Sequence, residues 1–335
     1  MSSVERVAIV TGASQEKGAG AAQQSIDKGY SVAASPRKSE AARRPGLAEV
    51  AGDVLQSETA GLIDVIRAAI GFLLVSAGFS VAYCAHAAPS ALDIIRARGV
   101  LLVGVTGDYP PFSWRSGNGD FAGADIDMAR SLARTIGVGV EFVPTTWAAL
   151  LADFASRRFD VALGGITITP ERAAKGEFSI PVMNDGKRPI VRCVDKDRLN
   201  SIAAIDQANV RVVTPPGGTN ETFARSTFKI ARVAVFPNNV TIFDEIAAGR
   251  MDVMVTDGVE VDYQSALHAG ILCPASVSAP FTRFQKAYLL PKDDEMKQFV
   301  DRWLAQQLAA GVWSKALDKA RRSEMHRGGT AASLR

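Results

Sequence analysis

The sequence predicts an α/β protein of two lobes, each a mostly parallel sheet flanked by helices, with a ligand cleft between the lobes. Strand and helix patterns alternate over residues 99–165, and the same alternation restarts after Pro189. The 248 residues from Ala88 to Arg335 are enough for two such units. Ligands of these folds bind outside the carboxyl ends of the strands, so we expect the site there.

The elements of the first unit follow from hydrophobic patterning. Residues 99–105 form a short apolar run typical of a buried strand, and two prolines fix the loop over 108–114. Apolar residues spaced three and four apart predict a helix over 125–136, which Gly137 ends. The next elements expected are a strand, a helix and a strand, at 138–143, 147–154 and 159–165.

The second unit repeats this alternation. Short runs rich in β-branched residues predict strands at 210–214, 232–236, 251–256 and 286–290. Longer runs with helical spacing predict helices at 219–226, 240–248 and 259–269, and one or two helices over 296–320. The chain is expected to return to the first lobe at its end. This gives lobe 1 as 88–189 plus 281–335 and lobe 2 as 190–280.

Composition limits the classes of function. Hydrophobic residues make up 47% and charged residues 22%, which are values of a globular protein with a sizeable core. The formal net charge is only +3 and no long block of like charges occurs, so nucleic-acid binding is not indicated. The three Cys and three His form no zinc-type pair, so no metal site is expected. A small molecule is the expected partner.

A stretch without charges suggests export. Residues 68–92 contain no Asp, Glu, Lys or Arg; Arg67 precedes them, and Ala85-His86-Ala87 forms a small-residue cleavage pattern. A buried core helix and a membrane anchor are the alternatives, although the run is at the lower limit for a membrane span. We expect a signal peptide over 62–87, hence a periplasmic protein with no stable membrane anchor after cleavage.

The chain begins with a different pattern. Val7–Ser14 resembles the start of a short-chain dehydrogenase, where a strand feeds a Gly-rich turn that holds a dinucleotide pyrophosphate. Gly12 and Gly18 match the first and third glycines of that family, but Glu16 replaces the second, and its carboxylate would repel phosphate. We therefore interpret residues 1–61 as an extension from a misassigned start or a gene-fusion remnant and expect no NAD chemistry.

A motif follows the third expected strand. Gly165-Ile-Thr-Ile-Thr-Pro-Glu-Arg172 resembles the signature of the polar amino acid solute-binding proteins, a two-lobed periplasmic family. Two further matches occur in the expected order, at Tyr109–Phe112 and Arg157–Asp160. The resemblance implies a periplasmic binding protein-like fold of type II. It also implies that Arg172 binds the ligand α-carboxylate through paired donors, with Gly165 and Thr167 beside it.

The segment after the next expected strand resembles one branch of this family. Thr214–Arg225 has two glycines before Thr219, which we expect to be the N-cap of a helix whose backbone N–H groups bind an anion. Together with other matches, this run resembles the cyclohexadienyl dehydratases, an enzyme branch of that family. The other matches are Asp185–Lys187, Asn238–Ile246, Val255–Glu260, Cys193 and Cys273. The branch converts prephenate to phenylpyruvate and arogenate to phenylalanine.

The resemblance implies that Glu221 is the catalytic acid. Loss of the ring hydroxyl as water requires a proton, while loss of the ring carboxylate as CO₂ supplies electrons. One positioned acid is then enough, and no metal or organic cofactor is needed. An acidic residue in a first helical turn can also simply complement the helix dipole, which lowers its pKa. The acid role therefore requires a closed apolar cleft and a doubly negative substrate to raise the pKa of Glu221.

Further residues are assigned to substrate binding. Asp257 aligns with the family's partner for an α-amino group, so it bears on the choice between prephenate and arogenate. The side chains available for the second carboxylate or the hydroxyl are Asn220, Lys187 and Lys286. The aromatic candidates for a wall against the ring are Tyr109, Phe112 and Trp147, which are equally suited to the core.

Two alternatives to a lyase remain open. A receptor of an ABC importer would have the same fold without a proton donor, so Glu221 discriminates between the two. A hydrolase with a Ser-His-Asp triad is the weaker alternative, because only His268 and His326 follow residue 88 and no Gly-x-Ser-x-Gly occurs. In an oxidising periplasm, Cys193 and Cys273 are expected to form a disulfide.

Overall fold

The computed structural model describes residues 7–11, 31–35, 88–116 and 118–332. The chain divides between Ala85 and His86, and the two parts are described separately. In the N-terminal part, β1 (Val7–Thr11) and β2 (Ser31–Ser35) pair in parallel. The expected signal peptide over 62–87 and the three positions of the dehydrogenase-like turn lie outside the described residues.

The first of two five-stranded sheets is mixed. Its order is β7 (Gly139–Pro144), β3 (Val100–Val105), β8 (Val161–Ala162), β17 (Leu289–Leu290) and β9 (Glu177–Phe178). β3 is parallel to both neighbours, whereas β17 is antiparallel to both of its own. β8 is shorter than the predicted strand over 159–165 because the chain turns at Gly164 and Gly165, which have positive φ.

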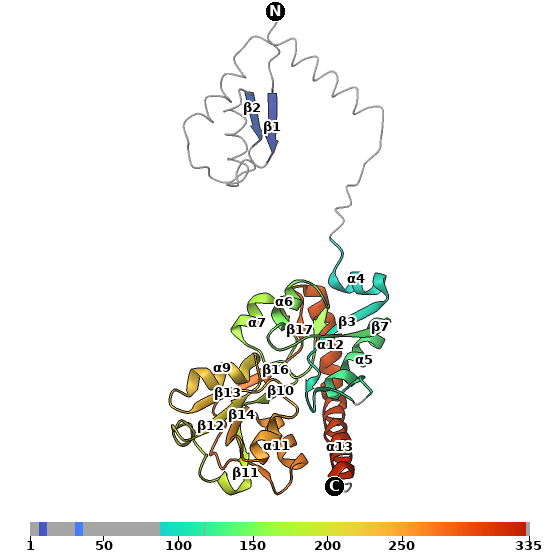
Figure 1. Cartoon of the computed structure of the whole chain (residues 1–335). Coiled ribbons are helices and arrows are strands. Elements are labelled where there is room, and N and C mark those ends of the chain that lie inside the picture. The colour runs from blue at the N-terminus through green and yellow to red at the C-terminus, as the bar shows by residue number, and fades with distance from the viewer. Residues whose placement is uncertain (1–6, 12–30, 36–87, 117, 333–335) are drawn as a thin grey trace, which may run out of the picture. The chain divides into compact units, whose positions relative to one another are not determined.

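Helices flank this sheet, and a small three-stranded sheet lies beside it (Figure 1). The helices are α4 (Ala91–Arg98), α5 (Ala124–Ile136), α6 (Leu150–Ala155), α7 (Pro170–Lys175), α12 (Asp294–Ala309) and α13 (Val312–Ala332). The small sheet contains β4 (Asp108–Tyr109), β5 (Ser113–Arg115) and β6 (Phe121–Ala122). Of the one or two helices expected over 296–320, the structure has two, which separate at Gly311 with its φ of 66°.

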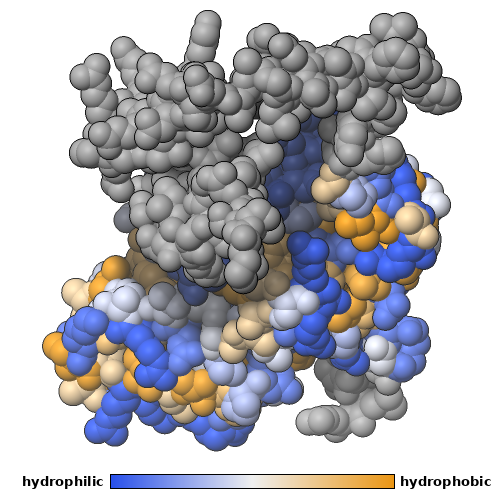
Figure 2. Space-filling model, turned by 90° about the horizontal axis from the view of Figure 1, so that it is seen from above, coloured by the Kyte–Doolittle hydropathy of each residue, from blue (hydrophilic) through white to orange (hydrophobic). Residues whose placement is uncertain are grey.

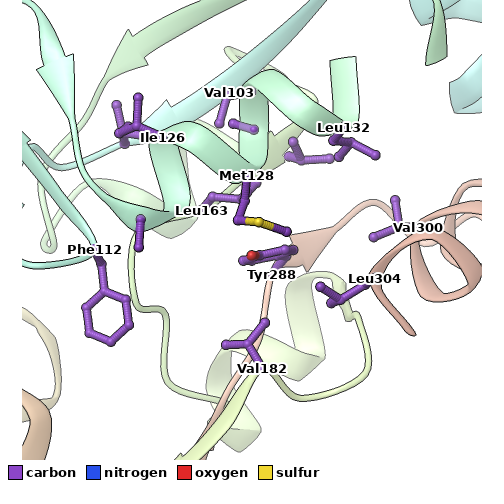
Figure 3. Packing of buried hydrophobic residues seen from close by; sticks show 14 of the residues in the cluster. Val103, Phe112, Ile126, Met128, Leu132, Leu163, Val182, Tyr288, Val300 and Leu304 are labelled. Carbon is purple, nitrogen blue, oxygen red and sulfur yellow. The ribbon is translucent and has the colours of Figure 1, made fainter. Parts of the chain in front are cut away.

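The core of this region joins distant parts of the chain. Met128 of α5 and Val300 and Leu304 of α12 pack around Tyr288, just before β17 (Figure 3). The apolar face predicted for 125–136 is therefore the buried face of α5. This packing anchors the C-terminal helices to the first sheet, as expected for a chain that returns to its first lobe.

The second sheet is also mixed. Its order is β13 (Arg232–Val235), β12 (Arg211–Thr214), β14 (Val253–Asp257), β11 (Lys187–Arg192) and β15 (Leu272–Pro274). β12 is parallel to its neighbours, and β11 is antiparallel to its own. The helices here are η1 (Cys193–Asp195), α8 (Ile202–Ile205), α9 (Gly218–Thr227), α10 (Ile242–Ala247) and α11 (Gly258–Leu267).

Two segments connect the sheets. β10 (Met183–Asp185) and β16 (Phe284–Lys286) pair antiparallel where the chain passes from the first sheet to the second and back. The strand expected over 286–290 is thus divided between β16 and β17. The structure confirms the two-lobed α/β fold, with mixed rather than mostly parallel sheets. The lobe boundaries near 190 and 280 stay a prediction.

A disulfide links two neighbouring segments of the second sheet region. Cys193 and Cys273 are bonded with an S–S distance of 2.06 Å, so the expected pair is present. Over the described residues, no helix has the length and apolar character needed to cross a membrane. On the face visible in Figure 2, hydrophobic side chains occur in small groups between hydrophilic ones.

Candidate functional site

A small pocket lies where loops from the two sheets meet. The first-sheet region contributes Tyr109, Trp147, Gly165, Thr167 and Arg172. The second-sheet region contributes Pro215, Gly217, Gly218, Thr219, Asn220, Asn239 and Asp257. Eight of these twelve residues were assigned to the site from the sequence. The predicted location at the strand ends, between the lobes, therefore agrees with this pocket.

Arg172 presents a buried cation to the pocket. Thr169 caps α7 by accepting the Arg172 backbone N–H, and the Arg172 side chain, 5% exposed, donates from Nη1 to the Thr167 carbonyl at 2.8 Å. Burial lowers the pKa of Arg172, and the charge of Asp257 opposes that change. Within the described residues, no carboxylate forms a salt bridge with Arg172. Its guanidinium is therefore suited to an anionic ligand.

A glycine turn forms the pocket wall beside this arginine. Gly165 has a φ of 73°, and a Cβ there would lie 2.5 Å from the Phe112 ring, so only glycine fits. Asp125, which is fully buried, accepts the Gly165 N–H at 2.7 Å and the Gly164 N–H at 3.0 Å. Burial raises the pKa of Asp125, while these N–H donors oppose the increase. Asp125 thus fixes the turn from behind the pocket.

Two lysines hold the carboxylate of Asp257. Lys187 Nζ lies 2.6 Å from Oδ1 and Lys286 Nζ lies 2.6 Å from Oδ2, and all three side chains are almost completely buried. Tyr109 also donates its hydroxyl to Oδ2. Burial alone would raise the pKa of Asp257, but the two lysines outweigh burial and hold this pKa well below its usual value. Asp257 is therefore an anion that already has partners on both oxygens.

Lys187 connects this group to the start of α9. Its ammonium donates to Thr219 Oγ1 at 3.0 Å and to the Asn220 side-chain oxygen. Asn220 Nδ2 in turn donates to Thr256 Oγ1 at 2.9 Å. The orientation of the Asn220 amide is thus defined from both ends. Lys187 and Lys286 do not line the pocket themselves but support the residues that do.

Glu260 is a buried carboxyl group behind this network. It has no exposed surface and accepts the Thr256 hydroxyl at 2.5 Å and the Asn239 side-chain N–H at 3.4 Å. Burial raises the pKa of Glu260 to about 8, and the nearby charge of Asp257 adds to the increase. Glu260 is therefore mainly neutral at pH 7. The sequence analysis assigned neither Glu260 nor Asn239, although Asn239 follows a predicted strand end.

Glu221 lies beside the pocket rather than in its lining. Its carboxylate accepts the Gly217 N–H at 2.6 Å and pairs with Arg225 Nε at 2.7 Å. The Gly217 hydrogen bond and then the Arg225 contact lower the pKa of Glu221. This is the opposite of the increase expected for a proton donor, because Arg225 lies one helical turn away. In this arrangement Glu221 is ionised.

The N-cap of α9 is not the residue that the sequence predicted. The N-cap of α9 is Gly217, with a φ of 70°, and no side chain caps it. Thr219 lies within the first turn, where its hydroxyl oxygen accepts from Lys187. The predicted N-cap role of Thr219 is therefore wrong, because the positive φ required before the helix favours the glycine. Gly218 and Thr219 still present the helix N-terminus to the pocket.

The aromatic candidates separate into two groups. Tyr109 and Trp147 line the pocket with ring centroids 5.6 Å apart in an edge-to-face contact. Trp147 Nε1 donates to Asp108 Oδ1 at 3.1 Å. Phe112 has no exposed surface and stacks behind Tyr109, so it belongs to the core. No group of three or more His, Cys, Asp or Glu side chains in the described part of the chain is arranged to hold a metal.

Contacts across the pocket hold the two sides together. Tyr109 and Lys286 reach Asp257 from the first-sheet side and the connecting strand, and Asn239 Nδ2 donates to the Asp108 carbonyl at 3.0 Å. Gly217 also lies directly against Ala148, as a Cβ at Gly217 would be 2.7 Å from the Ala148 nitrogen. The pocket is therefore closed over Asp257 in this structure.

The chain resembles known proteins over most of this C-terminal part. Residues 101–321 match the family model of the bacterial extracellular solute-binding proteins, family 3. The cyclohexadienyl dehydratase of Pseudomonas aeruginosa is 48% identical over 219 residues, which are 65% of this chain and 81% of that protein. The L-cystine-binding protein TcyJ of Escherichia coli is 30% identical over 192 residues, 57% of this chain and 71% of that protein.

A solved structure supports the same relationship. The crystal structure of an ancestral amino acid-binding protein, a precursor of cyclohexadienyl dehydratase, is 36% identical, with a TM-score of 0.63. The match covers 69% of this chain and 99% of that structure. Enzymes and receptors are both found among these relatives. The sequence match and the two-lobed fold together show that the chain belongs to the bacterial extracellular solute-binding proteins, family 3.

Proposed function

We propose that this chain is a decarboxylating dehydratase that converts prephenate to phenylpyruvate, arogenate to phenylalanine, or both. The charge of the pocket carries the proposal. Among the four charged side chains that are almost completely buried here, Arg172, Lys187 and Lys286 are cations and Asp257, to which both lysines bind, is an anion, so these four carry two net positive charges. A ligand with two carboxylates complements this balance. The 48% identity to a protein named cyclohexadienyl dehydratase supports the same activity.

The reaction needs one proton and no external oxidant. The C–C bond to the ring carboxylate breaks, CO₂ leaves, and its electron pair enters the ring. The C–O bond to the ring hydroxyl breaks, and the hydroxide takes a proton and leaves as water. The ring becomes aromatic, which favours both steps. For prephenate, the dianion and one proton give the phenylpyruvate anion, CO₂ and water, so the task of the protein is to bind and to donate a proton.

Within this proposal Glu221 is the acid. Its carboxyl group bonds to Gly217, a residue of the pocket wall, so a side-chain rotation would bring it toward the ligand. It must first take up a proton. The Arg225 partner is more than half exposed, and such surface pairs contribute only about 0–1 kcal/mol, so the pairing is weak. A ligand with two carboxylates beside Glu221 repels its ionised form and raises its pKa.

The cellular location is part of the proposal. Family 3 consists of extracellular solute-binding proteins, so we place the mature protein in the periplasm. The signal peptide would be residues 62–87, with residues 1–61 as an extension ahead of it. N-terminal sequencing of the exported protein tests this, and a mature chain that begins near Ser2 would contradict it.

The experiment for activity follows phenylpyruvate by its absorbance in alkali after incubation with prephenate. Wild type should form the product, whereas Glu221→Gln should lose turnover and still bind prephenate. Glu245→Gln is the matched control, because Glu245 is also a first-turn glutamate paired with an arginine, Arg250. Near-normal turnover by Glu221→Gln would remove its assignment as the acid.

A receptor of an ABC importer is the second candidate. The lowered pKa of Glu221 favours it, because an ionised carboxylate does not donate a proton. The relative that binds L-cystine is 30% identical over 192 residues. Binding of a small amino acid with no product from prephenate, in wild type, would replace the lyase proposal with this one.

A further inference from the structure

We propose that the site selects a substrate with an α-keto group over its α-amino counterpart, because Lys187 and Lys286 occupy both oxygens of Asp257. This inference rests on the proposed function and assigns its substrate as prephenate rather than arogenate. The two substrates share both carboxylates and the ring hydroxyl. They differ at one position, where prephenate has a carbonyl oxygen and arogenate has an ammonium group. The site is therefore expected to discriminate at that position.

The occupied carboxylate carries the argument. Asp257 ends β14 at the pocket and is 3% exposed. Each of its oxygens lies 2.6 Å from a lysine ammonium, and Oδ2 also accepts the Tyr109 hydroxyl. Each carboxylate oxygen can accept more than one hydrogen bond, but an α-ammonium at Asp257 would have to share an oxygen that a lysine ammonium already neutralises. A third ammonium at Asp257 would displace a lysine or share one anion among three cations, and their repulsion is poorly screened where all three side chains are buried.

Both lysine ammonium groups have a complete set of hydrogen-bond acceptors in this structure. Lys187 donates to Asp257, Thr219 and Asn220, which accounts for its three protons. Lys286 donates to Asp257, to the Gly165 carbonyl at 3.0 Å and to Tyr109 at 3.3 Å, which accounts for its own. Movement of either ammonium would leave buried oxygens without donors, a cost that an incoming ammonium would have to offset.

The pocket offers donors more than acceptors. Arg172 and the start of α9 provide hydrogens, and the Thr167 and Thr219 hydroxyls can donate as well as accept, although Thr219 Oγ1 already accepts from Lys187. Within the described residues, the buried side-chain acceptor of the lining that lacks a partner is Asn239 Oδ1, whose amide nitrogen donates to the Asp108 carbonyl. One acceptor suits a single hydroxyl, such as that on the ring. An ammonium carries three protons and would find few acceptors in the lining that do not already have a partner.

The net charge of the site also favours the keto substrate. The four buried charged side chains, Arg172, Lys187, Lys286 and Asp257, together carry two positive charges, which a dicarboxylate with a keto group offsets. The ammonium of arogenate would add a third positive charge to the closed pocket. Uncompensated charge in a water-poor site weakens binding, so the keto substrate should bind more tightly.

The test measures kcat/KM of the full-length protein for both substrates. Prephenate should exceed arogenate by at least about tenfold. In Lys187→Met the ratio should fall toward one, because Asp257 Oδ1 becomes available to an ammonium. Lys196→Met is the control, since Lys196 is exposed beside η1 and its ratio should equal that of wild type. Equal rates on the two substrates in wild type, or a ratio that Lys187→Met does not change, would overturn the inference.

A binding comparison in wild type covers two other outcomes, a Lys187→Met variant that does not fold and an absence of turnover. Phenylpyruvate and L-phenylalanine differ only at the same α-position, so calorimetry with this pair needs no variant and no reaction. Tighter binding of phenylpyruvate supports the inference. Equal or tighter binding of L-phenylalanine, or binding of neither, overturns it. Absence of product from both substrates refutes the proposed function alone, and the calorimetric comparison then decides the inference.

Discussion

Glu260→Gln should remove one component of the pH dependence of stability. Glu260 is fully buried between Thr256 and Asn239, with Asp257, Lys187 and Asp108 as the nearest charged groups. Its pKa rises from 4.5 to about 8 on folding, mainly through burial. Glutamine keeps the size of the side chain and an oxygen for the Thr256 hydroxyl, and it cannot ionise.

The sign follows from the direction of the pKa change. Below pH 4.5 the carboxyl group is protonated in both the folded and the unfolded chain, and its contribution to stability is complete. Between pH 4.5 and about 8 only the unfolded chain loses the proton, so the free energy of unfolding falls. The slope is about 1.4 kcal/mol for each pH unit, or about 5 kcal/mol over the whole interval as an upper limit. Above pH 8 both states are ionised and the contribution no longer changes.

Urea unfolding between pH 5 and pH 9, at constant ionic strength, measures this contribution. The free energy of unfolding of Glu260→Gln minus that of wild type should increase with pH up to about 8 and then level off. Glu295→Gln, at an exposed carboxyl group in the first turn of α12, serves as the control and should show no such increase. A difference for Glu260→Gln that stays constant from pH 5 to pH 8 would refute a raised pKa at this position.

Two further predictions concern the fold and closure of the cleft. The double variant Cys193→Ser and Cys273→Ser should lower the free energy of unfolding by about 2–5 kcal/mol, because the bond closes a long loop with a sequence separation of 80; urea unfolding measures this, and a change under about 1 kcal/mol contradicts it. Gly217→Ala should weaken prephenate binding by about tenfold or more, since its Cβ would lie 2.7 Å from Ala148 across the closed cleft. Calorimetry tests the binding, and thermal unfolding measures the separate loss of stability expected because alanine is strained at a φ of 70°; unchanged affinity would mean that this contact is not needed for closure.

Local patterns were sufficient for part of the fold. α5 matches its predicted range to within one residue, because its apolar spacing is regular and Gly137 ends it with a φ of 90°. β11 was missed because Pro189 interrupts its apolar run. The structure accommodates this proline in a ladder where its carbonyl accepts the Ala275 N–H at 3.0 Å. That arrangement depends on antiparallel neighbours far away in the sequence, which no local pattern reports.

The site residues, too, could be predicted only where a local motif contains them. Residues within the motifs, such as Arg172 and Thr167, could be assigned from the sequence and do line the pocket. Glu260 could not, because its environment arises from Thr256 and Asn239 on different elements after folding. The lowered pKa of Glu221 did have a local signal: Arg225 follows it by four residues, the spacing of a helical ion pair.

The pKa values of the two glutamates near the pocket are shifted in opposite directions. Gly217 and Arg225 keep Glu221 ionised, whereas burial keeps Glu260 neutral. The neutral state of Glu260 matters for the ligand, because an anion there would add a second negative charge beside Asp257 and reduce the net positive charge of the site. Loss of the Glu260 proton near pH 8 should therefore weaken the binding of a dicarboxylate, whereas its effect on the stability of the fold is already complete at that pH.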